Sequence, residues 1–293
     1  MDINYELYKV FYYVATTLSF SEASKQLFIS QSAVSQSIKA LEKKLDQSLF
    51  IRSTKRVQLT PEGEILLRHI EPAMNLIRRG EAQLTDIGST GGQIRIGASD
   101  TICRYFLVPY LERFHKAFPN AHISVTNRTS LGCVELLERG QVDLIIVNYP
   151  NSQLSNFYPT KKIKEFRDIF VANNSFAELK DRKVSLAELQ KHPILMLDKH
   201  STTSEFLHNL FQQEQLNLVP EIELSSNDLL IDLARIGLGI AFVPDFCINE
   251  KDDELFVVEL EKALPTRDLA IVYNNNTPIS KATQEFLNYF TGE

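Results

Sequence analysis

A short helix, a tight turn and a longer helix are predicted between residues 19 and 45, and this stretch constrains the fold more than any other. Ser21 is a suitable N-cap for the first helix. Residues 28–30 leave room for a turn of three or four residues, because Gln31 can already begin the second helix. Apolar residues recur every three or four positions through both helices: Ala23, Leu27, Val34, Ile38, Leu41 and Leu45. The pattern predicts a helix-turn-helix.

The outward face of the second helix carries side chains that suit a DNA groove. They are uncharged hydrogen-bonding residues and one lysine: Gln31, Ser32, Ser35, Gln36 and Lys39. The first acidic residue on this face is Glu42, although the chain holds 37 acidic residues. Amide, hydroxyl and ammonium groups can contact base edges and phosphates in a major groove. The simpler alternative is a solvated helical hairpin.

The next segment predicts a small β-hairpin, or wing, anchored by Phe50, Val57 and Leu59. Residues 20–60 contain seven Lys or Arg and three acidic residues, a balance of +4, in a chain of net charge −6. A basic island in an acidic protein fits binding to a phosphate backbone with release of counterions. The predicted DNA-contacting residues are Ser30, Gln31, Ser32, Ser35, Gln36, Lys39, Arg52, Lys55 and Arg56. Of these, the last three are expected to project from the wing.

Short motifs are dense between residues 20 and 63: an SQ-x-AVSQ-x-I core, an LE pair, LF-x-R and a closing VQLTPEG. In these motifs the chain resembles the winged helix-turn-helix of LysR-type transcriptional regulators. The resemblance covers the first third of the chain in detail and the rest only in architecture. Three positions depart from the family pattern, which commonly has Ala at Ser24, Pro at Ser32 and Gly at Asp46. The departures concern fine base preference and not the fold.

The length of 293 residues suffices for two or three domains without disulfide or metal staples. The three cysteines are widely spaced and odd in number, which indicates a reducing compartment. The N-terminus lacks a basic segment followed by a clean apolar core, and the chain has no uncharged apolar run of 18 residues. We therefore expect a soluble, cytoplasmic protein without membrane contact.

A long helix is predicted from Pro61, with Thr60 as its N-cap, to Gly88. It carries a heptad-like seam: Leu66, Ile70, Ala73, Ile77, Gly80, Leu84 and Ile87. Such a seam favours pairing with a second copy, whereas Pro72 and Gly80 also fit a bent connector. The resemblance implies the same pairing, since this family dimerises through its linker helix. A homodimer or homotetramer would then read a partly palindromic site on double-stranded DNA, and RNA polymerase is a further candidate partner.

Residues 93–293 predict a two-lobed α/β domain. They hold 20 basic and 27 acidic residues, and short apolar strands alternate with helices, which implies parallel sheets covered on both faces. The chain is expected to cross between lobes near residues 160–164 and to return near 266–269, and a last helix over 279–290 closes the first lobe. The architecture resembles the effector-binding half of the family, of periplasmic-binding-protein type. The predicted domains are 1–60 (DNA-binding), 61–92 (linker helix and hinge), 93–162 with 268–293 (lobe I) and 163–267 (lobe II).

Two hydroxyl-rich segments, 98–101 and 199–204, follow strands and begin helices, where ligands of α/β sheets bind. Their hydroxyls and backbone N–H groups suit a carboxylate or similar anion. The predicted effector-binding residues are Ser99, Asp100, Thr101, Asn148, Ser201, Thr202 and Thr203, with Tyr149 also at the floor of the cleft. The resemblance implies effector contacts at Ser99, Thr101, Ser201 and Thr202. N-capping alone would explain one residue in each segment. The charge of Asp100 raises the hypothesis of an amino-acid-like effector.

Other chemistry finds little support in the sequence. The glycines at 237 and 239 precede their strand, so they do not form a phosphate loop, and the six histidines show no zinc-ligand spacing. No GxSxG or comparable nucleophile motif occurs. Cys103 fits either a redox sensor or a small buried residue. We predict a transcription regulator without catalytic activity, metal or cofactor other than a small-molecule co-inducer. The alternative is a metabolite-binding or catalytic α/β protein that uses the helix-turn-helix only for assembly.

Overall fold

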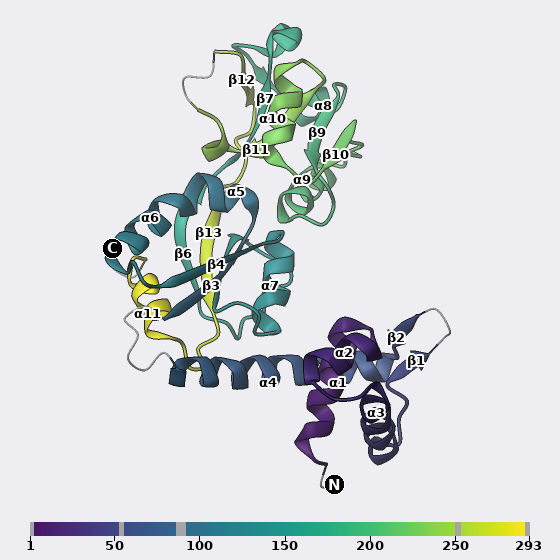
Figure 1. Ribbon diagram of the computed structural model, residues 1–293. Coiled ribbons are helices and arrows are strands. Elements are labelled where there is room, and N and C mark those ends of the chain that lie inside the picture. The colour runs from purple at the N-terminus through teal and green to yellow at the C-terminus, as the bar shows by residue number, and fades with distance from the viewer. Residues whose placement is uncertain (1–2, 53–55, 86–91, 250–252, 291–293) are drawn as a thin grey trace. The chain divides into compact units, whose positions relative to one another are not determined.

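The computed structural model describes residues 3–52, 56–85, 92–249 and 253–290 (Figure 1). The chain forms two compact units, the first of residues 1–87 with 138–141 and the second of residues 88–137 with 142–293. Each unit has its own hydrophobic core. Among the described residues, no helix is both long and apolar enough to cross a membrane.

The first unit is a winged helix-turn-helix followed by a long helix. Its elements are α1 (Tyr5–Thr17), α2 (Phe20–Leu27), α3 (Gln31–Leu45), β1 (Phe50–Arg52), β2 (Val57–Leu59) and α4 (Pro61–Thr85). The predicted turn and the start of α3 at Gln31 are confirmed. The predicted N-cap of α2 is wrong, because Ser19 accepts the hydrogen bond from the Glu22 amide and the helix begins at buried Phe20. Ser21 already lies in the first turn.

Helix α4 is capped by Thr60, whose Oγ1 accepts the Gly63 amide at 3.0 Å, as predicted. A Cβ at Gly63 would lie 2.3 Å from the Leu49 carbonyl oxygen, so only glycine fits this close approach of helix and wing. The predicted seam is divided. Leu66 and Ile70 pack on the core of the winged helix-turn-helix, whereas Ile77 and Leu84 are 56% and 70% exposed. Among the described seam residues, those from Ile77 onward are therefore accessible to a partner, while Ile87 and the predicted helix end at Gly88 lie outside the described residues.

The second unit contains two sheets, one in each lobe (Figure 1). The five-stranded sheet has the order β4-β3-β5-β13-β6, and its strands are β3 (Gln93–Ala98), β4 (His122–Asn127), β5 (Leu144–Tyr149), β6 (Thr160–Phe166) and β13 (Arg267–Tyr273). The six-stranded sheet has the order β10-β9-β11-β7-β12-β8, and its strands are β7 (Asp168–Ala172), β8 (Lys183–Val184), β9 (Ile194–Leu197), β10 (Ile222–Leu224), β11 (Ile240–Pro244) and β12 (Phe256–Leu260).

The prediction of parallel sheets is only partly correct. Strands β4, β3 and β5 are parallel, as are β10, β9 and β11. Strand β13 is antiparallel to β5 and β6, and β7 is antiparallel to β11 and β12. The antiparallel strands include those that carry the chain between lobes, and a strand that leaves or re-enters a lobe need not follow a helical crossover.

The crossing between lobes lies at Arg167, between Phe166 of β6 and Asp168 of β7. The predicted crossing at 160–164 is too early, because β6 pairs with β13 in the first sheet up to Phe166. Lobe II therefore begins five residues after the predicted 163. The return falls at Arg267, the first residue of β13, within the predicted range. Each of the two connections thus places one arginine at the hinge.

The helices of this unit cover its sheets. They are α5 (Asp100–Ile102), the π-helical turn η1 (Cys103–Leu107), α6 (Val108–Ala117), α7 (Ser130–Glu138), η2 (Asn174–Leu179), α8 (Leu186–Leu189), α9 (Thr202–Gln213), α10 (Asn227–Arg235), η3 (Asp245–Cys247) and α11 (Lys281–Asn288). As predicted, the last helix completes the first lobe, because Phe286 and Leu287 belong to its core.

Candidate functional site

The outer face of α3 presents the predicted polar side chains to solvent. Val34, Ile38 and Leu41 are fully buried on its inner face, which fixes the opposite face outward. The exposed residues there are Gln31, Ser32, Gln36 and Lys39, and Ser35 is half-buried. Ser30 caps the helix, since its Oγ accepts the Ala33 amide at 3.2 Å and lies 2.9 Å from the Ser32 hydroxyl. The end of α3 that carries base-reading residues in helix-turn-helix proteins is thus polar and uncharged.

The wing is fastened to α3 by Glu42. Its Oε1 accepts the backbone amides of Leu49 and Phe50 at 2.9 and 3.3 Å, and its Oε2 lies 3.4 Å from the Arg52 guanidinium. Arg52 also donates to Ser35 Oγ at 3.3 Å and lies over the Phe20 ring. The expectation that Arg52 projects from the wing is therefore wrong, because its charge is held against α3. Arg56 is exposed, and Lys55 lies outside the described residues.

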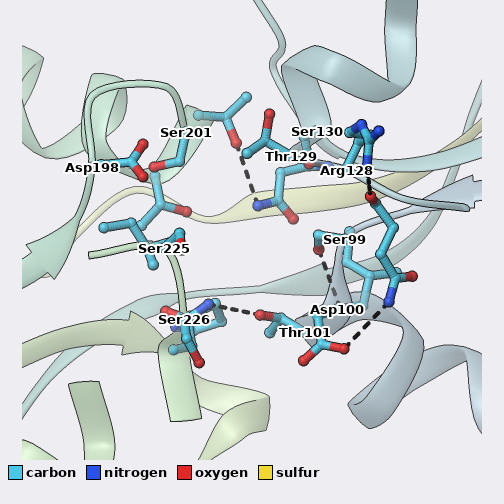
Figure 2. A pocket seen from close by; sticks show the side chains of 18 of the residues that line it. Ser99, Asp100, Thr101, Arg128, Thr129, Ser130, Asp198, Ser201, Ser225 and Ser226 are labelled. Carbon is cyan, nitrogen blue, oxygen red and sulfur yellow. Dashed lines mark hydrogen bonds between the residues drawn. The ribbon is translucent and has the colours of Figure 1, made fainter. Parts of the chain in front are cut away.

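A cavity of about 340 Å³ lies between the two lobes of the second unit (Figure 2). All seven residues that the sequence predicted for an effector line it: Ser99, Asp100, Thr101, Asn148, Ser201, Thr202 and Thr203. Tyr149 does not, because successive side chains of a strand point to opposite faces and Asn148 takes the inward position. The structure brings these residues together, and their contact with an effector stays a prediction.

The cavity is also lined by two sets of polar residues that were not predicted from the sequence. They lie at the end of β4 and after β10: Asn127, Arg128, Thr129 and Ser130, and then Ser225, Ser226 and Asn227. The signal was the same as for the predicted segments, a strand followed by hydroxyls at a helix start. Asp198 also lines the cavity, on the side opposite to Arg128 (Figure 2).

Four helix N-termini converge on the cavity. Ser99, Ser201 and Ser226 cap α5, α9 and α10, each accepting a backbone amide at its hydroxyl, and Thr129 does the same for Gly132 of α7. Helix α5 continues through η1 into α6. Each helix N-terminus carries a partial positive charge of roughly half a unit, together with unpaired N–H groups. The cavity therefore favours an anion, although Asp100 and Asp198 add negative charge.

Side chains join the two lobes around the cavity. On one side the Asn148 amide donates to Thr202 at 3.4 Å, and on the other the Asn227 amide donates to Thr101 at 2.9 Å. Beyond it, the Tyr105 hydroxyl donates to Asp228 at 2.5 Å. Burial and this hydrogen bond raise the pKa of Tyr105, so the phenol stays protonated and remains a donor. The lobes are thus held together by polar contacts that flank the cavity.

A buried ion pair lies at the hinge. Arg267 of β13 donates from Nη1 to Asp168 of β7 at 2.7 Å and to the Thr203 hydroxyl at 3.2 Å. Both charged side chains are almost completely buried, and the guanidinium lies near the rings of Phe166 and Phe206. Burial raises the pKa of Asp168, and the neighbouring Arg267 opposes that change. Thr203 connects this pair directly to the cavity wall.

Cys103 does not have the properties of a reactive thiol. Burial, with a smaller contribution from Asp100, raises its pKa from 9.0 to about 11. Its Sγ lies 3.4 Å from the Asn127 side-chain oxygen. Since the thiolate is the reactive form, the environment works against a redox role. Among the described residues, no three His, Cys, Asp or Glu side chains are grouped so that they could hold a metal ion.

Known families match both units. Residues 5–64 match the model "Bacterial regulatory helix-turn-helix protein, lysR family", and residues 88–293 match the "LysR substrate binding domain". The chain belongs to the LysR family. It is a LysR-type transcriptional regulator with an N-terminal DNA-binding domain and a C-terminal effector-binding domain.

Individual relatives of this LysR-family chain agree. A protein of Thalassiosira pseudonana named "Probable RuBisCO transcriptional regulator" is 30% identical, with 96% of this chain and 94% of the relative covered. Among solved structures, full-length CbnR in complex with its target DNA is 16% identical, with a TM-score of 0.68 and 99% of each chain covered. The CcmR regulatory domain from Synechocystis PCC6803 in complex with 2-PG is 19% identical, with a TM-score of 0.62, 68% of this chain and 95% of that chain covered. These structures share the fold of this chain.

Proposed function

We propose that a small anion binds in the cavity between the lobes and controls how this regulator acts on its operator. The observation that carries the proposal is the convergence of four helix N-termini on one cavity of about 340 Å³. Such a volume suits a small metabolite, and the partial charges favour a carboxylate or phosphate group. Because the wall comes from both lobes, the anion would stabilise their closed arrangement.

On the DNA side, α3 reads bases through Gln31, Ser35 and Gln36. The exposed basic residues Lys39 and Arg56, with Lys55, hold phosphates. Arg52 acts differently from the other three cations, since its contact with Glu42 orients the wing relative to α3. We expect phosphate contact at Arg52 only in addition to this role. Ser30 and Ser32 complete the surface at the start of the helix.

The chain acts as a homodimer or homotetramer in the cytoplasm, and two copies of α3 read the halves of a partly palindromic operator. Support for pairing comes from the exposed half of the α4 seam, where Ile77 and Leu84 face solvent and a Cβ built at Gly80 meets no atom within 4 Å. Whether the bound regulator also touches RNA polymerase is tested by co-migration of the two on promoter DNA.

The test of the proposed function measures two responses of the full-length protein. Fluorescence anisotropy with labelled duplexes should show binding that weakens steeply with salt. A thermal-shift series with small carboxylates and phosphates should raise the melting temperature, because a ligand of the folded state stabilises it by mass action. Turnover of a metabolite, or the absence of duplex binding in dilute buffer, would favour an α/β protein that uses the helix-turn-helix only for assembly.

A further inference from the structure

The polar groups of the cavity fall into two classes with opposite demands on a ligand. The capping hydroxyls of Ser99, Thr129, Ser201 and Ser226 each accept a backbone N–H. One lone pair of each hydroxyl oxygen is engaged in that bond, and the hydroxyl hydrogen remains available to donate. Together with the N-terminal amides of their helices, they call for hydrogen-bond acceptors on the ligand. An anionic group meets this demand.

Two side-chain carbonyls make the opposite demand. Asn148 Oδ1 and Asn227 Oδ1 are buried and have no hydrogen-bond partner among the described residues. Each of the two amide nitrogens is engaged with a threonine hydroxyl, at Thr202 and Thr101 respectively. Asn227 is only 4% exposed, and both residues line the cavity. Leaving a buried acceptor without a donor is costly, so the two carbonyls are suited to a ligand that donates.

The carboxylates of the cavity add to this second demand. Asp100 and Asp198 line it, and the labelled side chains of Figure 2 place Asp198 across the cavity from Arg128. One oxygen of Asp198 accepts the His200 amide and one of Asp100 accepts the Asn127 side-chain amide. Two carboxylates near the helix N-termini would repel an anion that had nothing to offer them. A donor on the ligand converts that repulsion into a hydrogen bond or an ion pair.

We propose that the effector is an anion that also carries a hydrogen-bond donor, a hydroxyl or an ammonium group, as in small hydroxy acids and amino acids. The inference rests on the proposed function of the cavity and narrows its ligand class. The anionic group meets the capping hydroxyls and helix N-termini, and the donor meets Asn148, Asn227 and the nearby carboxylates. An anion without a donor leaves both carbonyls unpartnered.

Three four-carbon dicarboxylates separate these cases: succinate, L-malate and L-aspartate. They share both carboxylates and differ only at C2, which bears hydrogen, hydroxyl or ammonium. Calorimetric titration of the full-length protein should give at least about tenfold tighter binding for malate or aspartate than for succinate, as expected when a buried acceptor gains its donor. The better of the two identifies the donor as hydroxyl or ammonium.

Variants of the two asparagines test whether their carbonyls cause the preference for malate or aspartate over succinate. Asn227→Leu and Asn148→Leu should each reduce the preference over succinate, because they remove the acceptor while the capping hydroxyls stay in place. The control Lys262→Ala changes a residue of lobe II that pairs with Glu214 and does not line the cavity, and it should keep the full preference. Comparing two ligands on one variant cancels a general loss of folding or affinity.

The outcomes also separate this inference from the proposed function. Succinate binding as tightly as malate and aspartate would overturn the inference and leave an anion-binding regulator. An unchanged preference in both asparagine variants would overturn it as well. If none of the three ligands binds at about 10 mM, far above the range of specific affinities, the inference fails, and the thermal-shift series with other carboxylates and phosphates still tests the anionic effector of the proposed function. Duplex binding by the same preparation would still test the DNA-binding function.

Discussion

The hinge ion pair provides a sharp test of the packing described above. Replacing Arg267 by Met puts an unbranched apolar side chain in place of the guanidinium beside Phe166 and Phe206, and it leaves Asp168 buried without its cation. Breaking a buried pair on one side costs about 3–5 kcal/mol. For a domain of this size each kcal/mol lowers the melting temperature by about 2–4 °C. Calorimetry of the full-length protein should therefore show the transition of the second unit lowered by roughly 6–20 °C.

The loss should depend on pH in a defined direction. Burial already raises the pKa of Asp168, and without Arg267 nothing opposes that effect. A carboxyl whose pKa is raised by folding binds its proton more tightly in the folded state. Stability is then largest below the pKa of the unfolded chain, about 3.9, and falls as pH rises through the folded value. Arg267→Met should accordingly be closer to wild type at pH 5 than at pH 8.

Two controls decide the interpretation. The double variant Asp168→Leu with Arg267→Met removes both charges and should recover most of the lost stability, since apolar replacements of buried pairs are often neutral. Lys262→Met, which breaks an exposed pair with Glu214, should leave the transition unchanged within error. A single variant as stable as wild type, or a double variant no better than the single one, would refute the reasoning.

Three further predictions concern single residues. Arg56→Ala should weaken binding to all duplexes equally and reduce the slope of log K against log salt by about 1. Gln36→Ala should weaken binding to some duplex sequences more than to others. A sequence-selective loss for Arg56→Ala would contradict its assignment to phosphate. Iodoacetamide should modify Cys103 about 100-fold more slowly at pH 7.5 than a free thiol of pKa 9, because burial raises the pKa of Cys103 to about 11. Mass spectrometry measures the rate, with Cys103→Ser as the control. Rapid modification would restore a redox role. Phe28→Gly should have a free energy of unfolding equal to that of wild type or up to about 1 kcal/mol higher, because Phe28 is 94% exposed and has φ 54°. Urea unfolding checks this, with Phe28→Ala as the strained control. A less stable glycine variant would show that the ring packs in solution.

The elements with strong local signals follow from the sequence. The helix-turn-helix is readable because its apolar spacing and tight turn specify both helices, and Thr60 and Pro61 mark the start of α4. Strands β8, β10 and β12 are not evident from local sequence, because they have only two, three and five residues and their pairing partners lie far along the chain. Strand direction was mistaken for the same reason, since no local pattern records whether a distant strand runs parallel or antiparallel.

About half of the candidate site could be predicted from the sequence. Segments 98–101 and 199–204 were found because each follows an apolar strand. The equivalent hydroxyls at 129–130 and 225–226 were not singled out, although they also follow strands, a half-exposed one and one of three residues. Glu42 contacts the backbone amides of residues seven and eight positions later, which requires the wing to fold back on α3. The pairing of Arg267 with Asp168 spans 99 residues. Contacts of that range depend on the three-dimensional fold and leave no periodic trace.

The cavity and the hinge share one residue, which would connect the proposed ligand binding to lobe closure. Thr203 lines the cavity and accepts a hydrogen bond from Arg267, while Thr202 beside it contacts Asn148 of the other lobe. A ligand can favour closure only to the extent that it binds the closed arrangement more tightly than the open one. Because the capping hydroxyls come from both lobes, an open arrangement offers a ligand only one set at a time. Typical coupling free energies of about 1–3 kcal/mol, or 5- to 150-fold in affinity, correspond to one or two such hydrogen bonds to a charged group. The second set of donors is therefore sufficient to account for the proposed control by an anion.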